Sequence, residues 1–204
     1  GTAGATKPAH FDEQHNFLNQ VRGYKLVVLF PQEDYPKMYP FPVTHPCDRC
    51  SMIDIKHPDL QRFPRFAEAS GYYTVLGPGD MLYIPYGWWH YCRTLTNLAA
   101  SITFWAEVSS PGANFVVPER FGSDDLTRAR RNIEKMLAQD VGPPNLENEV
   151  LRILQQLELR NLSDMRIVSL RKLLEVLKMP DSEHVRFLKD TFQGRFGFDQ
   201  NKYV

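Results

Sequence analysis

The chain has 204 residues, a length that suits one domain with an appendage and allows a substantial buried core. Its 24 Lys and Arg residues balance its 24 Asp and Glu residues, so charge gives no argument for a nucleic acid or an anionic membrane as partner. No apolar stretch approaches the length of a membrane span and no signal peptide is recognisable, so we expect neither membrane association nor direct nucleic-acid binding.

The cysteines and the start of the chain bear on where the protein works. Three cysteines, an odd number, speak against a disulfide framework and indicate a reducing compartment, so we expect the cytoplasm, the nucleus or both. Cys47 and Cys50 form a C-x-x-C, which is either half of a zinc site, a redox pair or a plain loop with two thiols. The sequence begins without Met, and we expect a fragment that lacks the upstream part of its first domain.

Residues 1–105 have the pattern of strands and loops. Short, β-branched or aromatic runs bounded by turn residues predict strands. These lie at residues 23–30, 72–76, 81–85, 90–95 and 98–105. Residues 31–64 are rich in Pro, His and Asp and lack periodicity, which predicts a long loop, and ordered loops of that length are usually functional.

The apolar spacing changes to that of helices after Pro111. Ser123 is a plausible N-cap for the first helix, and Gly142-Pro143-Pro144 is expected to end it. Helices are predicted at residues 123–140, 147–159, 166–177 and 183–191. We therefore divide the chain into a β core, residues 1–110, and a helical region, residues 111–204, whose apolar faces either cover the β core or pair with a second copy.

Three residues in the β core have the chemistry of a metal site. On a strand, His10 and Asp12 project from the same face because residues two apart point the same way. His90 follows a predicted turn and strand, and two tryptophans precede it. Two histidines and one carboxylate suit a divalent first-row metal and leave positions open for substrate and O₂. A pair of surface residues and a satisfied core histidine are the alternative interpretations.

Lys25 is the fourth residue of interest, at the start of an otherwise apolar strand. A charge that points into a barrel is unfavourable unless it is paired, and a dicarboxylate cosubstrate would supply the partner. The alternative is a strand-end lysine whose amine reaches water. We also expect Tyr83, Trp88 and Trp89 to form an aromatic wall that keeps the site dry.

Several sequence blocks together resemble the JmjC asparaginyl hydroxylases, the family of the enzyme that inhibits hypoxia-inducible factor. They are His10-Phe-Asp-Glu-Gln-His-Asn-Phe, Gly23-Tyr-Lys, Tyr39-Pro-Phe-Pro-Val, His45-Pro-Cys-Asp-Arg, Arg62-Phe-Pro, Gly77-Pro-Gly-Asp-Met-Leu-Tyr-Ile-Pro, Trp88-Trp-His and Arg131-Asn-Ile-Glu-Lys-Met-Leu. The resemblance is strong over residues 4–105 and recurs at residues 130–137. It implies a double-stranded β-helix, a cupin-like jelly roll, with an α-helical C-terminal region.

The resemblance also implies an activity and the residues that carry it. The implied activity is hydroxylation of a protein side chain that depends on Fe(II) and uses 2-oxoglutarate and O₂ as cosubstrates. The implied target is a segment such as an ankyrin repeat or part of a transcription factor. The implied enzyme is a homodimer joined through its C-terminal helices. Roles are implied for three groups of residues. These are iron ligation by His10, Asp12 and His90, cosubstrate binding by Lys25, Asn16 and Thr6, and substrate contacts by Arg49, Cys50 and Trp105.

The chain departs from the family pattern at several positions. Lys7, with Thr6 beside it, stands where the family has a cosubstrate-binding Thr, and Cys50 stands where the family has a Gln that holds the target amide. Thr103 replaces an Asn, and an upstream cosubstrate-binding Tyr is absent from the sequence. Three alternatives therefore stay open: a related hydroxylase with another target residue, a cupin enzyme that needs no 2-oxoglutarate, and a non-catalytic cupin-like module.

Overall fold

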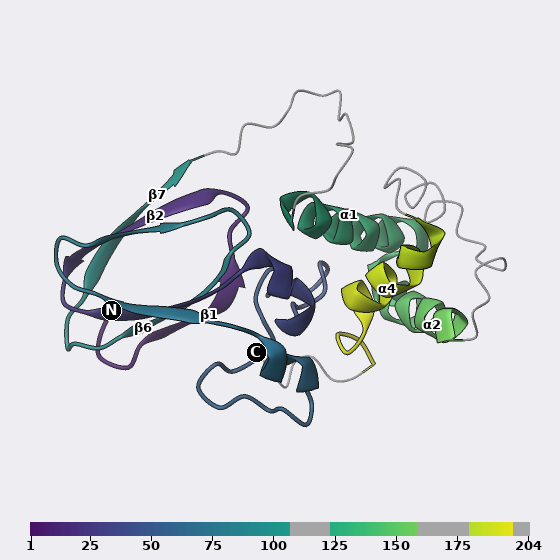
Figure 1. Ribbon diagram of the computed structural model, residues 1–204, viewed down its shortest axis with the longest axis horizontal. Coiled ribbons are helices and arrows are strands. Elements are labelled where there is room, and N and C mark those ends of the chain that lie inside the picture. Colours follow the sequence, from purple (N-terminus) through teal and green to yellow (C-terminus); the bar gives the residue numbers. More distant parts are fainter. Residues whose placement is uncertain (107–122, 159–179, 198–204) are drawn as a thin grey trace. The chain divides into compact units, whose positions relative to one another are not determined.

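The computed structural model describes residues 1–106, 123–158 and 180–197, which form two compact units (Figure 1). The first, the β unit, comprises residues 1–38 and 49–106. The second, the helical unit, comprises the described helices together with Tyr39–Asp48. A ten-residue stretch of the long loop thus belongs with the helices, and the expected boundary at residue 110 lies outside the described residues.

Two antiparallel sheets build the β unit, and in Figure 1 β1 and β6 run side by side. The strands are β1 (Thr6–Phe11), β2 (His15–Arg22), β3 (Lys25–Phe30), β4 (Tyr72–Leu76), β5 (Met81–Ile84), β6 (Trp89–Thr94) and β7 (Ala100–Ala106). One sheet has the order β1-β6-β3-β4 and the other the order β5-β2-β7. The expected cupin-like β core with C-terminal helices is confirmed. The sequence did not single out β2 as a strand.

Apolar side chains pack on both faces of the four-stranded sheet. Strand alternation sends Val27, Leu29 and Leu76 inward to meet Leu18 and Ile84 of the other sheet. The opposite face carries Phe11, Phe30, Trp89 and Tyr91, which the loop covers with Tyr35 and Met38. That loop contains two short 3₁₀ helices, Gln32–Lys37 and Pro64–Glu68. Both faces are thus covered along β1, β6 and β3, whereas Tyr73 and Val75 of the edge strand β4 are exposed.

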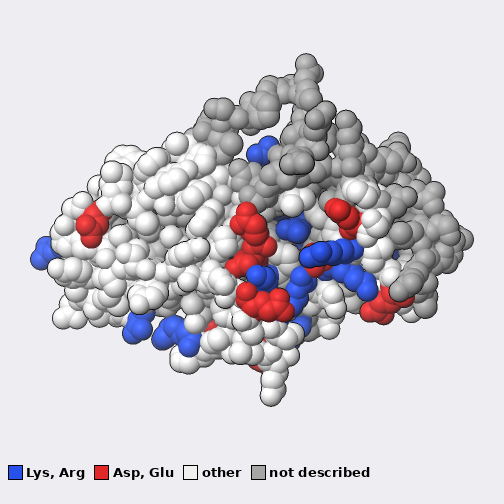
Figure 2. Space-filling view, viewed as in Figure 1, with Lys and Arg blue, Asp and Glu red and all other residues white. Residues whose placement is uncertain are grey.

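The three-stranded sheet is different, because one of its faces is open to solvent among the described residues. Phe17 of β2 lies directly between Tyr83 of β5 and Phe104 of β7, and Met81 and Ile102 flank the row. Tyr83 is 47% exposed and Phe104 is 60% exposed. The part of the β unit visible in Figure 2 is correspondingly poor in charged side chains.

The helical unit contains α1 (Ser123–Val141), α2 (Leu146–Glu158) and α4 (Asp181–Phe192), with a 3₁₀ turn at Pro143–Asn145. Gly142, at a φ of 82°, separates α1 from that turn, which confirms the predicted break. The apolar stripes of the helices meet in one core. Its most buried members are Ile133, Leu137, Val150, Ile153, Leu188 and Phe192.

Three of the four predicted helices are confirmed, and the helix expected at residues 166–177 lies outside the described residues. No helix in the described ranges combines the length and apolarity needed to cross a membrane.

Candidate metal centre

Two antiparallel strands bring the histidines together. His10 on β1 pairs directly with His90 on β6, and the centroids of the two rings are 4.1 Å apart. Directly opposed residues of an antiparallel pair project from the same face. Asp12 follows the last residue of β1, and its Oδ2 lies 3.7 Å from Nε2 of His90. The three side chains that the sequence singled out therefore converge, although 80 residues separate His10 from His90.

Backbone carbonyls fix the tautomer of both imidazoles. Nδ1 of His10 lies 2.9 Å from the carbonyl oxygen of Pro8, and Nδ1 of His90 lies 3.2 Å from that of Trp88. A carbonyl oxygen only accepts, so each Nδ1 carries the hydrogen and donates it. Nε2 of each ring is then left with a lone pair, and a carbonyl behind a ligating His is the usual orienting partner.

The Asp12 carboxylate is held by its own neighbours. Asn16 Nδ2 donates to Asp12 Oδ2 over 3.0 Å, and the Gly87 amide donates to the Asp12 carbonyl over 3.0 Å. Gly87 has a φ of 72°, a conformation that favours glycine. These contacts restrain both the side chain and the backbone of Asp12 and leave Oδ1 available to a ligand.

Together the three residues make one candidate metal site. Their ligand atoms all lie within 4.8 Å of one another, and within the described ranges they are the one such group of His, Cys, Asp and Glu residues. Two neutral imidazoles and one carboxylate fit a ferrous ion with open coordination positions. The donor set and the free lone pairs therefore suit the metal that the sequence predicts.

Burial keeps both imidazoles neutral. Burial, together with the neighbouring His10, lowers the pKa of His90 to about 4 although Asp12 raises it in part. Burial is also the main reason why the pKa of His10 is lowered. Since a metal binds the unprotonated ring, both residues are ready to ligate at neutral pH.

Lys25 lies on the same face of the sheet as the histidines. Register pairs Lys25 with Thr94 and pairs Leu29 with His90, so Lys25 is four residues further along the strand pair. At about 3.3 Å per residue, the backbones of these two rungs are about 13 Å apart. Within the described chain, no carboxylate lies at ion-pair distance from the Lys25 amine, so this cation is open to an anionic ligand.

Register distinguishes Lys7 from Thr6. A bulge between Lys7 and His10 places Lys7 opposite Cys92, two residues from His90, and Thr6 opposite Arg93. Lys7 therefore shares the face of the histidines, and Thr6 projects from the other face and is exposed. Cosubstrate binding by Thr6 remains a prediction. On this register Lys7, and not Thr6, lies on the face of the sheet that carries the histidines.

Asn16 and Trp105 lie opposite each other on β2 and β7. Asn16 is 4% exposed, and its Oδ1 has no hydrogen-bond partner among the described residues. Trp105 is 60% exposed. Asn16 therefore has an unused acceptor beside Asp12 and Trp105 has exposed surface, and their roles in cosubstrate and substrate binding remain predictions.

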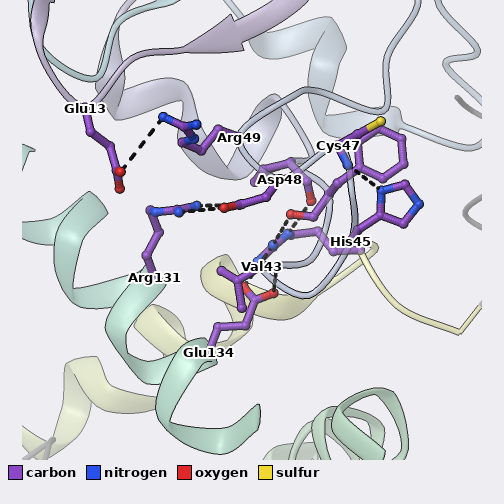
Figure 3. Close-up of polar contacts among 11 residues, drawn as sticks. Glu13, Val43, His45, Cys47, Asp48, Arg49, Arg131 and Glu134 are labelled. Atoms are coloured by element: carbon purple, nitrogen blue, oxygen red, sulfur yellow. Dashed lines mark hydrogen bonds and ion pairs between the residues drawn. The ribbon is translucent and has the colours of Figure 1, made fainter. Parts of the chain in front are cut away.

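Arg49 and Cys50 come next to β1 from the long loop. Cys50 forms an isolated antiparallel bridge with His10, and the guanidinium of Arg49 lies 3.9 Å from Glu13 (Figure 3). Arg49 has a φ of 69°, a backbone conformation that is uncommon outside glycine and is often found at functional sites. Cys50, like Cys47 and Cys92, is not part of a disulfide bond. The two residues expected to contact substrate thus adjoin a metal ligand.

The sequence missed one residue on the histidine face of the sheet and misplaced two others. Cys92 lies between His90 and Thr94 on their face of β6, and burial raises the pKa of its thiol to about 11. Strand alternation from His90 was the signal that would have found it. The expected aromatic wall is corrected, since Trp89 packs on the opposite face of the sheet and Tyr83 on the outer face of the other sheet, which leaves Trp88 against the inner cluster.

Comparison with known proteins agrees with this geometry. Residues 1–109 match the family of cupin-like domains, and the chain belongs to that family. Lysine-specific demethylase 8 of Xenopus tropicalis is 41% identical over 107 residues, 52% of this chain and 23% of that protein. HSPB1-associated protein 1 of Homo sapiens is 34% identical over 139 residues, 67% of this chain and 26% of that protein.

A third relative is JmjC domain-containing protein F of Dictyostelium discoideum, 34% identical over 120 residues, 52% of this chain and 25% of that protein. The chain thus spans about a quarter of the length of the curated relatives it matches.

Proposed function

We propose that the protein is an Fe(II)- and 2-oxoglutarate-dependent oxygenase that hydroxylates a protein side chain. One observation carries the proposal. His10, Asp12 and His90 converge with each Nδ1 held by a backbone carbonyl, while Lys25, which has no ion-pair partner among the described residues, lies further along the same sheet face. Membership of the cupin-like family and a relative named as a demethylase support it.

The chain's own groups would position the reactants. Iron and 2-oxoglutarate supply the oxidising chemistry when bound, and the protein binds, orients and shields. The carbonyls of Pro8 and Trp88 hold the two rings so that Nε2 points to one place, and Asn16 restrains Asp12. The apolar inner cluster, with Trp88 packed against it, would limit access of bulk water.

Lys25 would bind the far carboxylate of 2-oxoglutarate. Its rung lies about 13 Å along the strands from that of His90, a distance that a lysine side chain and a five-carbon diacid can bridge together. A charge-assisted hydrogen bond in this half-buried place is stronger than one between neutral groups. A cupin enzyme that does not use 2-oxoglutarate would not need Lys25 to bind a cosubstrate.

The substrate is a protein or peptide segment in this proposal, with an asparagine as the first candidate target. Arg49, Cys50 and Trp105 would contact it, as the resemblance of the sequence implies. A second candidate is a methylated lysine, favoured by the relative named lysine-specific demethylase 8. Homodimerisation through the C-terminal helices is part of the same proposal, and light scattering of the purified chain tests it.

Release of labelled CO₂ from 2-oxoglutarate tests the reaction. The wild-type chain is expected to turn over 2-oxoglutarate with Fe(II), and Asp12→Ala is expected to lose this turnover. Asp54→Ala, which alters an exposed loop carboxylate, serves as the control. Full turnover by Asp12→Ala would refute the proposal, and absence of any turnover by wild type would favour a non-catalytic cupin-like module.

Two further measurements refine the proposal. Lys25→Ala is expected to raise KM for 2-oxoglutarate at least about tenfold, because one charge-assisted contact is lost. If Lys25→Ala leaves KM unchanged while another cupin reaction proceeds, the cosubstrate assignment is wrong. Mass spectrometry of ankyrin-repeat asparaginyl peptides and methyl-lysine peptides then identifies the target, as a gain of one oxygen or the loss of one methyl group.

A further inference from the structure

A segment of the long loop, Tyr39–Asp48, belongs to the helical unit although neither the metal site nor the cosubstrate site uses it. It contacts the sequence block that begins at Arg131 on α1. The guanidinium of Arg131 binds the carboxylate of Asp48 through two parallel contacts, Nη1 to Oδ1 over 2.7 Å and Nη2 to Oδ2 over 2.8 Å (Figure 3). Such a bidentate pair fixes orientation as well as distance.

Glu134, one turn further along α1, holds the middle of the same segment. Its Oε1 accepts the backbone N–H of Val43 over 2.8 Å (Figure 3). Its Oε2 lies 2.9 Å from Nη2 of Arg195, and both side chains are almost completely buried. Residues three apart on a helix share a face, so Arg131 and Glu134 present two contacts to one stretch of chain.

Arg195 completes the anchor from the end of the helical unit. Its Nε donates to the carbonyl of Pro40 over 2.8 Å, and its Nη2 donates to that of Phe41 over 3.1 Å. Burying such an ion pair costs more desolvation free energy than its attraction alone returns, so it contributes mainly by specifying one arrangement. Segment 39–48 is therefore fixed by backbone contacts at residues 40, 41 and 43 and by a side-chain contact at residue 48.

One peptide bond after Asp48 the chain enters the β unit beside the metal ligands. The Phe11 amide donates to the Arg49 carbonyl over 3.2 Å, and the Ser51 amide donates to the Ala9 carbonyl over 2.7 Å. The bridge between Cys50 and His10 lies between these two hydrogen bonds. Residues 49–51 thus form a strip along the part of β1 that carries His10.

We propose that Arg131 and Glu134 of α1 are positioning residues for substrate: they anchor segment 39–48 and so hold residues 49–51 against the ligand-bearing strand. The part of this inference that concerns substrate rests on the proposed function. The part that concerns the anchor does not. On this view the helical unit has a role in the reaction although it supplies no ligand and no cosubstrate contact.

Hydrogen exchange of the whole chain tests the anchor. Asp48→Asn removes the carboxylate that Arg131 binds, and Glu134→Gln weakens the contacts to Val43 and Arg195. Each is expected to speed exchange of the Phe11 and Ser51 amides by about tenfold, while Val28 in the β3–β6 ladder stays unchanged. Glu149→Gln, which breaks an ion pair with Arg152 on α2, is the control and is expected to change neither amide.

The outcomes separate the two parts of the inference. Wild-type exchange at Phe11 and Ser51 in Asp48→Asn overturns the anchor, and that variant remains informative if Glu134→Gln does not fold. With the peptide substrate from the panel, Asp48→Asn is expected to raise peptide KM about tenfold and leave substrate-independent 2-oxoglutarate turnover unchanged. An unchanged peptide KM overturns the positioning role. Failure of wild type to use 2-oxoglutarate refutes the proposed function, while exchange still decides the anchor.

Discussion

The β unit and the helical unit both bury polar and charged groups, but they satisfy them differently. In the helical unit, Arg131 binds the carboxylate of Asp48, and Arg195 binds both Glu134 and a backbone carbonyl. In the β unit, the Nε2 atoms of the site histidines and Oδ1 of Asn16 are left without such bonds among the described residues. Buried polar atoms without a hydrogen-bond partner in the described part of the chain occur in both units, so they indicate a ligand site only where, as at His10, Asp12 and His90, metal-ligating side chains also converge. The contrast separates a structural network from a binding site within one chain.

The largest expected effect is the loss of a metal ligand in the β unit. His90→Ala is expected to lower the affinity for Mn(II), used as an air-stable substitute for Fe(II), by at least about 100-fold. His57→Ala, at an exposed loop position, is the control. Electron paramagnetic resonance of free Mn(II) measures the affinity. If His90→Ala binds Mn(II) with wild-type affinity, the β unit does not hold a metal through this residue, and the contrast between a binding site and a structural network fails.

The apolar cores offer a matched pair of variants. Ile84→Ala in the β unit and Leu188→Ala in the helical unit each remove a side chain that is at most 1% exposed. Each is expected to lower the free energy of unfolding by about 2–5 kcal/mol. Because all three tryptophans lie in the β unit, fluorescence reports that unit, whereas far-ultraviolet circular dichroism reports mainly the helices.

The two signals sharpen the comparison. Leu188→Ala is expected to move the denaturant midpoint seen by circular dichroism more than that seen by fluorescence, and to leave Mn(II) affinity unchanged. Ile84→Ala is expected to show the reverse order. Identical shifts in both signals for both variants would mean that the two units unfold as one.

The buried imidazoles make the stability of the metal-free β unit sensitive to acid. The pKa of His90 is about 4 in the folded state, below its ordinary value of 6.5. Between these values the unfolded chain binds a proton that the folded chain does not, so stability is complete above about pH 6.5 and falls toward pH 4. The full loss is expected to reach about 3 kcal/mol.

Fluorescence-detected unfolding with a chelator present measures this dependence. Since other groups also titrate in this range, the relevant quantity is the difference between wild type and His90→Gln, which lacks the titrating ring. A difference that does not vary from pH 7 to pH 4 would contradict the buried, neutral state of His90.

The smallest expected effect concerns Lys7, whose positive charge shares the face of the metal ligands. The charge contributes to the lowered pKa of both His10 and His90, and it repels a divalent ion for the same reason. Lys7→Thr is expected to raise Mn(II) affinity about two- to fivefold at low salt and less at high salt, because Lys7 is exposed and screened. Lys56→Thr on the loop is the control, and an equal gain there would show a general charge effect.

Much of the fold and part of the site could be predicted from the sequence, for reasons visible in single elements. Strand 72–76 and the helix starting at Ser123 begin where predicted, since Gly and Pro mark their boundaries and apolar periodicity marks their type. β2 (His15–Arg22) was not singled out because its inward positions include the polar residues Asn16 and Gln20, which break the apolar alternation.

The sequence by itself determined which residues have ligand chemistry and which half of the chain is β or helical. These properties depend on residue type and short-range periodicity. Only the tertiary structure decided that His10 opposes His90, that Lys7 and not Thr6 shares their face, and that segment 39–48 belongs with the helices. Strand register and a single bulge set the first two, and contacts between residues more than 80 positions apart set the third. No local pattern encodes such pairings, because their free energy comes from groups that meet only once the chain has folded.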